Sequence, residues 1–456
     1  MKTSNSKEID MVHGPLLAKM IIFTIPVLLS GMLQLLFNAA DVVVVGKYAG
    51  PAALAAVGST GSLINLLTNL FIGLSVGSNV IVAHYRGAGN EKRISEAVHT
   101  SILISFVGGL VLAAVGFFFA EPILKLMDTP ADVIGLATKY LKIYFLGMPS
   151  VMVYNFGASI LRAVGDTKRP LYFLTLSGVV NVILNLTFVI GLGMDVDGVG
   201  IATVISQTIS AVLVVICLMR EEGALKLTFS NLRINSHVLG KIVKIGLPAG
   251  LQGTLFSLSN VVIQSGINFF GKTVVAGNSA ALNIEGFVYI AMNSMYQASI
   301  TFTSQNYGAG EKKRVLRVCL LSEIVVFIIG VVFGGLVILF ANELMGIYTD
   351  EAAVIEIGII RIKYICTCYF LLGMMDSMVG ALRGIGYSVM PMLVSLIGVC
   401  GFRLLWVATY FKMHHSIEVL YLSYDISWAI TLAVLIICFV IVYRKIPDKE
   451  KKVSVS

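Results

Sequence analysis

Three acidic side chains, Asp41, Glu285 and Asp376, lie inside long apolar stretches of this 456-residue chain. A charged group at membrane depth costs about 2.5–3.5 kcal/mol on insertion scales, so each acid requires a function or a partner. Intramembrane carboxylates often mark pathways for protons, ions or charged solutes. Three further acids lie nearer the ends of apolar stretches, where an interfacial position is an equally good explanation: Glu323, Glu356 and Asp425.

Asp41 ends a polar stripe that also contains Ser30, Gln34 and Asn38. Steps of four, four and three residues place these side chains on one face of a helix. Such a stripe can be a seam that joins helices through hydrogen bonds. We favour the other interpretation, in which the stripe faces an ion or a solute.

A second polar stripe has the same spacing and contains Ser177, Asn181 and Asn185. A helix rises 1.5 Å per residue, which places Asp41 roughly 6 Å and Asn185 roughly 9 Å from the predicted outer ends of their helices. The two side chains can therefore meet in one pocket in the outer leaflet. A carboxylate with Asn and Gln oxygens could exchange a proton there or hold sodium.

The second half of the chain has its own polar stripe, which begins at Glu285. Its further members and the methionines beside it are Tyr289, Asn293, Tyr296, Met292 and Met295. Carboxylates among Tyr and Met side chains suit a flat apolar cation, because the acid meets the charge and the rings stack on it. Ordinary packing explains any single Tyr or Met equally well, and Asp376 could instead pair with Arg383 or Arg403.

The composition indicates an integral membrane protein. The chain is 57% hydrophobic and 13% charged, and its mean hydropathy is +0.90. Soluble domains carry about 25% charged residues. Soluble enzymes and nucleic-acid-binding proteins are therefore excluded, and the net charge of +8 is the Lys/Arg excess expected of cytoplasmic loops.

Apolar runs between polar breaks predict an all-α protein with twelve transmembrane helices. The predicted spans are 17–45, 52–81, 98–119, 134–158, 170–191, 198–218, 238–268, 276–304, 317–340, 353–379, 390–410 and 418–443. With the N-terminus inside, 24 of the 33 Lys and Arg residues fall on the cytoplasmic side and eight at outer loops or helix ends, including Arg361. Arg403 is the one basic residue assigned to a span. This bias predicts a multi-pass protein of the cytoplasmic membrane with both termini in the cytoplasm.

The chain repeats itself. Gly87-Ala-Gly-Asn-Glu-Lys-Arg93 recurs as Gly308-Ala-Gly-Glu-Lys-Lys-Arg314, and Leu161-Arg-Ala-Val-Gly165 recurs as Leu382-Arg-Gly-Ile-Gly386, both 221 residues later. Pro26 and Pro248 match at an offset of 222. Such a constant offset indicates a duplication. Six helices per half make the two repeats parallel, an architecture that places a solute pathway between the halves.

The repeat also predicts the domain boundaries. We expect a cytoplasmic N-terminus, a first six-helix half, a cytoplasmic linker, a second six-helix half and a cytoplasmic tail, over residues 1–16, 17–219, 220–237, 238–443 and 444–456.

These features together resemble the multidrug and toxic compound extrusion (MATE) family. The resemblance rests on two six-helix halves, the Gly-Ala-Gly loops with basic residues, the Leu-Arg-x-x-Gly motifs and Asp41, and it covers residues 17–443. It implies an antiporter that exports organic cations in exchange for protons or sodium. It also implies that Asp41, Asn181 and Asn185 form the coupling-ion pocket, although Asn185 stands where many members have Asp. Asp376 matches an acid of sodium-coupled members, whereas the seventh helix here has no acid.

We therefore predict a cation-coupled secondary transporter that exports small organic cations by alternating access. Protons or sodium, held at Asp41 or Asp376, would drive it. The predicted pocket residues are Gln34, Asn38, Glu285, Tyr289, Met292, Asn293 and Asp376. We expect a monomer that contacts membrane lipid, with no cofactor, no nucleic acid and, because no Walker motif is present, no ATP.

Three alternatives fit the sequence less well. A lipid-linked oligosaccharide flippase of the same superfamily would need a strongly basic groove, whereas the predicted intramembrane charges are mainly acidic. A membrane-embedded enzyme would need a catalytic constellation, and the six histidines fall in loops or near span ends. A major facilitator transporter has parallel halves but lacks these loop motifs.

Overall fold

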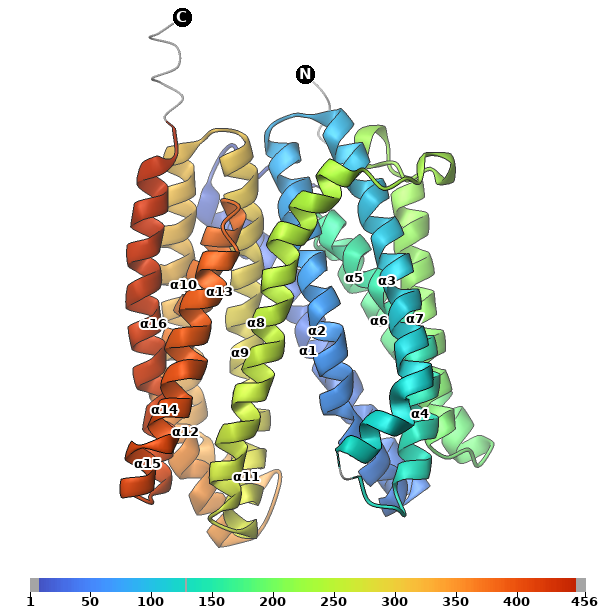
Figure 1. Ribbon diagram of the computed structural model, residues 1–456, viewed down its shortest axis with the longest axis vertical. Coiled ribbons are helices and arrows are strands. Elements are labelled where there is room, and N and C mark those ends of the chain that lie inside the picture. The colour runs from blue at the N-terminus through green and yellow to red at the C-terminus, as the bar shows by residue number, and fades with distance from the viewer. Residues whose placement is uncertain (1–7, 128, 448–456) are drawn as a thin grey trace, which may run out of the picture. The chain divides into compact units, whose positions relative to one another are not determined.

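A computed structural model of the chain describes residues 8–127 and 129–447. Parts of the predicted cytoplasmic N-terminus and tail, residues 1–7 and 448–456, lie outside the described residues. Helices connected by short loops make up the described part of the chain, and it contains no β-strand (Figure 1). This agrees with the prediction of an all-α protein.

Each of the twelve predicted spans corresponds to one helix or to a chain of consecutive helical segments. In order these are α1 (Leu16–Val44) with the π-helical turn η1 (Val45–Ala49), α2 (Pro51–Gly87), α3 (Glu91–Leu126), α4 (Ile134–Leu146) with α5 (Met148–Ala163), α6 (Lys168–Asn185) with η2 (Leu186–Gly191), α7 (Val196–Met219), α8 (Ser236–Asn268), α9 (Lys272–Gly308), α10 (Lys312–Leu339) with the short α11 (Ala341–Gly346), α12 (Ala352–Gly384), α13 (Val389–Ser395) with η5 (Leu396–Gly401), α14 (Phe402–Ala408) and α15 (Tyr410–Met413), and α16 (Ile417–Lys445). The linker contains two short 3-10 turns, η3 (Gly223–Leu225) and η4 (Phe229–Asn231).

Ten helical stretches of the described residues are long and apolar enough to cross a membrane. The pair α4 and α5, bent by 47° at Gly147, makes an eleventh if it is counted as one span. The one predicted span that this count leaves out is the seventh, α8. It is a 33-residue helix in which polar side chains such as Gln252, Asn260 and Gln264 lower the hydropathy. The chain is thus a multi-pass membrane protein.

Contacts divide the chain into two compact units that differ from the two sequence halves. The first contains Met1–Ile9 and Leu29–Gly250, and the second contains Asp10–Leu28 and Leu251–Ser456. The beginning of α1 therefore packs in the second unit, and the beginning of α8 packs in the first. Pro26 and Pro248 each stand two residues before the changeover. A proline removes one backbone hydrogen bond from a helix, so both helices are locally weakened beside the point where they change units.

In the first unit, α8 crosses α2 through glycines. A Cβ atom at Gly73 would lie 2.1 Å from the backbone nitrogen of Gly250, and one at Gly77 would lie 2.3 Å from the carbonyl oxygen of Ile242. A Cβ atom at Gly246 would lie 2.5 Å from Leu74 Cα. Small residues four apart let membrane helices approach at the backbone, so this crossing depends on glycine.

The corresponding crossing in the second unit, between α1 and α9, uses larger side chains. Thr24 Oγ1 lies 3.5 Å from Met295 Sδ. The ring of Phe23 meets that of Phe302 edge-on, with centroids 5.6 Å apart. The two related crossings are therefore built from different kinds of packing.

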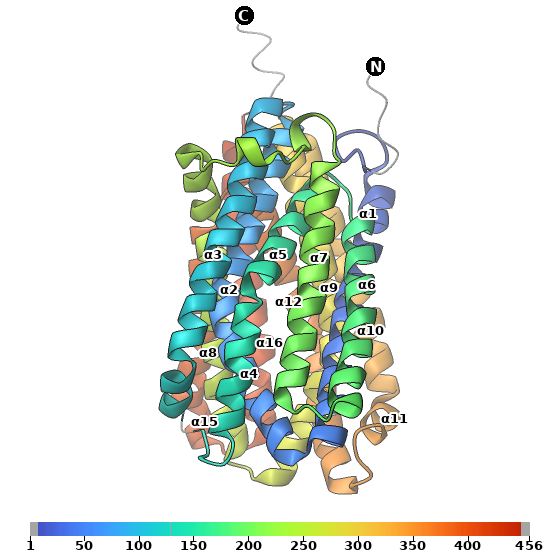
Figure 2. The same cartoon turned by 90° about the vertical axis from the view of Figure 1, so that its right-hand side faces the viewer.

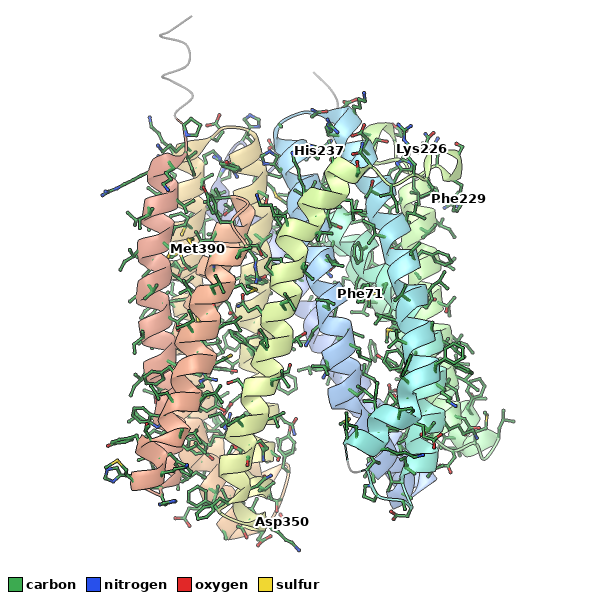
Figure 3. The ribbon with its side chains drawn as sticks, in the orientation of Figure 1. Phe71, Lys226, Phe229, His237, Asp350 and Met390 are labelled. Atoms are coloured by element: carbon green, nitrogen blue, oxygen red, sulfur yellow. The ribbon has the colours of Figure 1, made fainter. Side chains whose placement is uncertain are left out.

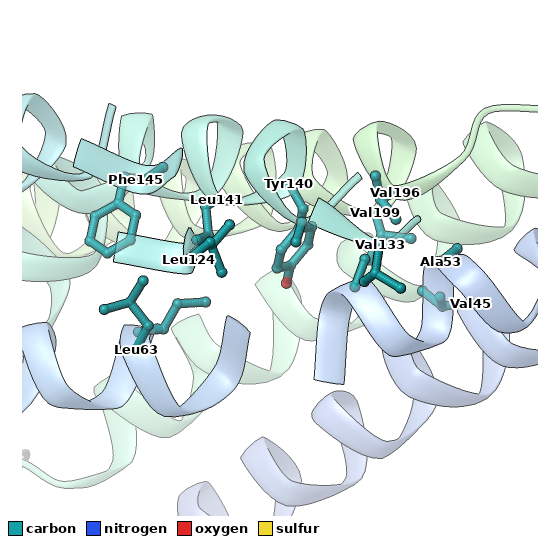
Figure 4. Close-up of a cluster of buried hydrophobic side chains, with 14 of the residues drawn as sticks. Val45, Ala53, Leu63, Leu124, Val133, Tyr140, Leu141, Phe145, Val196 and Val199 are labelled. Atoms are coloured by element: carbon teal, nitrogen blue, oxygen red, sulfur yellow. The ribbon is translucent and has the colours of Figure 1, made fainter. Parts of the chain in front are cut away.

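The helices α3, α4, α5, α6 and α7 of the first unit run side by side (Figure 2). An apolar cluster packs α4 against its neighbours, and Leu63, Leu124, Leu141 and Phe145 lie together in it (Figure 4). Tyr140 belongs to the same cluster. Lys226 and Phe229 of the linker lie at the same end of this unit as His237, at the start of α8 (Figure 3).

Candidate ion and substrate site

Asp41 and Asn185 meet in the first unit. The Asn185 Nδ2 donates a hydrogen bond to Asp41 Oδ1 at 2.5 Å, and it also lies 3.3 Å from Asn181 Oδ1. The structure thus brings together the acid of α1 and the two amides of α6 that the residue spacing singled out. The two predicted stripes meet at their last members, Asp41 and Asn185.

Local backbone structure places these groups. Asp41 lies in the last turn of α1 and Asn185 is the last residue of α6, and a π-helical turn follows each helix directly. The two π turns, η1 and η2, pack against each other. Such turns are rare and occur frequently at functional sites, because they re-aim side chains within an otherwise regular helix.

The site has one unsatisfied acceptor. Asn185 is only 1% exposed, and its Oδ1 has no hydrogen-bond partner among the described residues. A buried polar atom without a partner costs free energy, so an unpaired oxygen beside a carboxylate favours the binding of a proton donor or a cation. Asn181 is buried beside it, whereas Asp41 remains partly accessible. The arrangement can therefore exchange a positive charge with its surroundings.

Two tyrosines of α4, Tyr140 and Tyr144, complete the surroundings of Asp41. Both lie close enough for its charge to act on their hydroxyl groups. Neither was predicted as part of the site, because the helix was recognised only as an apolar run over residues 134–158. Their spacing of four residues, which places both rings on one helix face, was the available signal.

Gln34 and Asn38 lie on the same helix as Asp41 but are exposed. The structure does not join either of them to Asp41 by a hydrogen bond within the described residues. Their membership of the pocket remains a prediction from helix periodicity.

The second unit places Glu285 differently from the prediction. Its two oxygens accept hydrogen bonds from Nε and Nη2 of Arg361 at 2.9 and 2.8 Å, and Arg361 Nη1 donates to Asn278 at 2.8 Å. Glu285 and Arg361 are each 2% exposed. This bidentate pair neutralises the acid inside the unit, so the view of Glu285 as an open charge for a solute is not supported by the geometry.

The assignment of Arg361 to an outer helix end was wrong. Arg361 is the tenth residue of α12, which places it roughly 14 Å along the helix axis from the first residue. Arg361 contacts two aromatic rings in addition to Glu285. The centres of the Tyr421 and Tyr424 rings lie 5.4 and 5.7 Å from the Arg361 guanidinium carbon. A charge at this depth requires such partners.

Asp376 lies beside Tyr289 on α9, and Arg383 is near enough to act on its charge. Arg383 itself donates to the Tyr296 hydroxyl at 2.6 Å and to Gln252 Oε1 at 2.7 Å. Within the described residues Asp376 forms no ion pair within 4.0 Å. Unlike Glu285, it is therefore not neutralised by a directly bound guanidinium group.

The remaining members of that pocket divide into exposed and packed residues. Tyr289 is 36% exposed, and Asn293 Nδ2 lies 3.4 Å from its hydroxyl oxygen. Met292 is buried, and its sulfur lies against Gly373 of α12. For Met292 the packing interpretation accounts for what the structure shows.

Three arginines, and not Arg403 alone, are buried in the second unit. Arg361, Arg383 and Arg403 are 2–4% exposed. Arg403 lies over the ring of Tyr424 at 4.0 Å, and its Nε donates to the Ser427 hydroxyl at 3.1 Å. Arg361 and Arg383 thus join Arg403 as buried basic residues of this unit.

Comparisons with known proteins agree with this fold. The MatE family model matches the chain twice, over residues 26–187 and 248–409. The two matches begin 222 residues apart, as the predicted duplication requires.

A probable multidrug resistance protein, YoeA, of Bacillus subtilis (strain 168) is 28% identical over 93% of this chain and 94% of its own length. A probable multidrug resistance protein, NorM, of Thermotoga maritima is 26% identical over 85% and 84%. The solved structure of a MOP superfamily transporter from Pyrococcus furiosus superposes with a TM-score of 0.91 at 19% identity, over 97% of this chain and 99% of that one. The last comparison supports the fold alone, and the predicted fold class is confirmed.

Proposed function

The chain belongs to the MatE family of secondary transporters, and from this premise we propose that it exports organic cations across the cytoplasmic membrane in exchange for protons or sodium. It is a transporter and not an enzyme. The proposal that it exports drugs is supported by the description of its relatives as multidrug resistance proteins. We further propose that it works as a monomer with both termini in the cytoplasm.

The observation that carries the coupling proposal is the contact between Asp41 and Asn185. One carboxylate, one buried amide oxygen without a partner and the neighbouring Asn181 form a small oxygen-rich site at a helix end. A proton would neutralise Asp41, and sodium could be held by the same oxygens. A bound proton or sodium ion removes the free-energy cost of a carboxylate at membrane depth. Binding of the ion can therefore favour one conformation of the site over another.

We assign Asp376 and Tyr289 to recognition of the organic cation. Asp376 forms no ion pair with any described residue, and Tyr289 offers an accessible ring beside it. An acid next to an aromatic face attracts an organic cation by charge and by cation–π contact. In the first unit Gln34 and Asn38, and in the second unit Asn293, would add polar contacts for a solute.

One alternative gains support from the structure. Arg383 and Arg403 are buried with mainly neutral partners, and such guanidinium groups could bind an anionic or lipid-linked solute, as a flippase requires. The same experiment can test both proposals.

The experiment uses purified protein in liposomes, with flux of ethidium or a fluorescent lipid-linked oligosaccharide measured under separate proton and sodium gradients. We expect ethidium export driven by one of these gradients. Asp41→Asn should abolish that export, whereas Asp376→Asn should mainly weaken equilibrium binding of ethidium. Transport of the lipid-linked solute without ethidium export would favour the flippase. Full ion-driven export by Asp41→Asn would refute the coupling assignment.

A further inference from the structure

Glu323 on α10 is a buried acid that the proposed function does not use. It is the twelfth residue of that helix, roughly 16 Å along the axis from the first residue, so it lies deep within an apolar span. The residue is only 8% exposed, and neither carboxyl oxygen has a hydrogen-bond partner among the described residues.

The neighbours of Glu323 offer no positive charge. Ser377 of α12 lies beside it, and the Ser377 hydroxyl is also buried and unpaired. On its own helix the nearest titratable group is Cys319, whose sulfur lies 3.8 Å from Met378 Sδ. Asp376 precedes Ser377 on α12 but lies beside Tyr289 and Arg383. No ion pair to Glu323 occurs in the described part of the chain.

Packing does not explain why an acid occupies this position. With the offset of 221, Glu323 corresponds to Ile102 in the first half, a buried apolar residue of α3. The related helix thus fills the same place with a hydrocarbon side chain. An unpaired carboxylate costs several kcal/mol more than such a side chain, so its presence calls for a role that involves the charge.

A bound proton would give the unpaired groups hydrogen-bond partners. The protonated carboxyl is neutral, which removes most of the cost of burial, and its O–H can donate to Ser377 Oγ. The Ser377 hydroxyl can in turn donate to a free oxygen of the carboxyl group. A single proton would therefore satisfy groups from two helices.

We propose that Glu323 is a proton-binding site of the second unit, which holds a proton in the seam between α10 and α12 and exchanges it when water enters that seam. The site is separate from Asp41 and does not depend on which ion Asp41 binds. Because the ligand is H⁺, the proposal differs from a sodium site, and sodium binding is an outcome that the test can detect.

The test is labelling of the purified full-length protein with dicyclohexylcarbodiimide, which reacts with protonated carboxyl groups in apolar surroundings. Mass spectrometry of peptides then measures labelling at Glu323 and at Glu343, an exposed acid of α11. We expect at least about tenfold more labelling of Glu323 near neutral pH, because burial without a partner favours the neutral form. The matched variant Cys319→Ala, which changes the same helix face and keeps the acid, should label equally.

Two results would overturn the proposal. Labelling of Glu323 no greater than that of Glu343 would mean that the acid is ionised, and protection by sodium at constant pH would make it a metal-cation site. Infrared spectra give an independent reading, since wild type should show the carbonyl band of a protonated acid that Glu323→Gln lacks. That band should shift in D₂O faster while ethidium is being exported than at rest, and an equal rate would refute the exchange. Labelling requires no transport, so its failure is distinguishable from failure of the proposed function.

Discussion

Two polar pairs between helices, one in each unit, differ in how completely their hydrogen-bonding groups are satisfied. Glu285 and Arg361 form a closed pair in which the two carboxylate oxygens are bound by one guanidinium group. Asp41 receives one hydrogen bond from an amide, and Asn185 keeps a buried oxygen without a partner. A closed pair is costly to break, because removing one partner leaves a buried charge, whereas an open pair can bind an ion that arrives from outside.

The duplication makes the contrast sharper. With an offset of 222 in the first helix and 221 later, Asp41 and Asn185 correspond to Ile263 and Trp406, which pack together in an apolar cluster. In the other direction, Glu285 and Arg361 correspond to Ile64 and Tyr140, which belong to the apolar cluster of the first unit. Each half therefore has a polar pair where the other has a hydrophobic contact.

This reciprocity indicates that the halves have specialised. The scaffold folds with either a polar or an apolar pair at both places, so neither pair is required by the architecture itself. The two polar pairs lie between different pairs of helices in the two halves. We infer that the open pair serves transport and the closed pair serves the packing of the second unit.

The largest expected effect comes from breaking the closed pair. Arg361→Leu leaves Glu285 buried without a partner, which should destabilise the protein by about 3–5 kcal/mol. Thermal unfolding in detergent and the yield of monodisperse protein measure this. The double variant Glu285→Ile with Arg361→Tyr copies the first half and should recover most of the loss. An unchanged unfolding temperature in Arg361→Leu, combined with lost ethidium binding, would place the pair in the substrate site.

The open pair should respond in the opposite way. Asp41→Asn removes a charge that has no guanidinium partner, so the unfolding temperature should be unchanged or slightly higher. Ion-driven ethidium export should be abolished, because the variant lacks the carboxylate that binds the coupling ion. Efflux and unfolding are measured on the same preparations as for Arg361→Leu. A large loss of stability in Asp41→Asn would show that both pairs are structural and would remove the contrast.

A smaller effect is expected when the open pair is given a second acid. Asn185→Asp places two carboxyl groups within hydrogen-bond distance, and interacting acids release their protons in two coupled steps. The pH profile of ethidium export should therefore change from one step to two, with a change of about threefold in the maximal rate. Ser177→Ala, on the same buried face of α6, is the control. A single-step profile in Asn185→Asp would mean that Asp41 does not titrate during transport.

Much of the fold could be predicted because apolar run length and polar breaks are properties of the local sequence. The contact of Asp41 with Asn185 was also predictable, since both lie on regular helix faces at similar depths. Arg361 was misplaced because its partners, Glu285 and Asn278, lie on another helix, and charge at the edge of an apolar run looks interfacial. The exchange of the beginnings of α1 and α8 between units was missed for the same reason, because it depends on packing between distant segments.

The smallest expected effect lies outside the membrane, where the first unit also binds the chain just before α1. Glu8 Oε2 accepts a hydrogen bond from Arg86 at 2.5 Å, and the backbone of Ile9 packs so closely on Gly165 that a Cβ atom there would lie 2.6 Å from the Ile9 carbonyl oxygen. Gly165 has φ +93°, which favours glycine, whereas the corresponding Gly386 has open space around it.

Burial raises the pKa of the Glu8 carboxyl, and the neighbouring Glu221 adds to the rise while Arg86 opposes it. A raised pKa means that the folded state holds the proton more tightly than the unfolded state does, so the stability contribution of Glu8 is greatest at low pH and falls as pH rises through the folded pKa.

This loss of stability should stay below about 1 kcal/mol, because the pair of Glu8 and Arg86 is partly exposed. Unfolding temperatures of wild type and Glu8→Gln, measured between about pH 5 and pH 7.5, should therefore converge at the acidic end and separate toward the basic end, with wild type declining relative to the variant. A wild type that instead gains stability over Glu8→Gln as pH rises would show that the Arg86 ion pair outweighs burial, and that this attachment is a closed pair like that of Glu285 and Arg361.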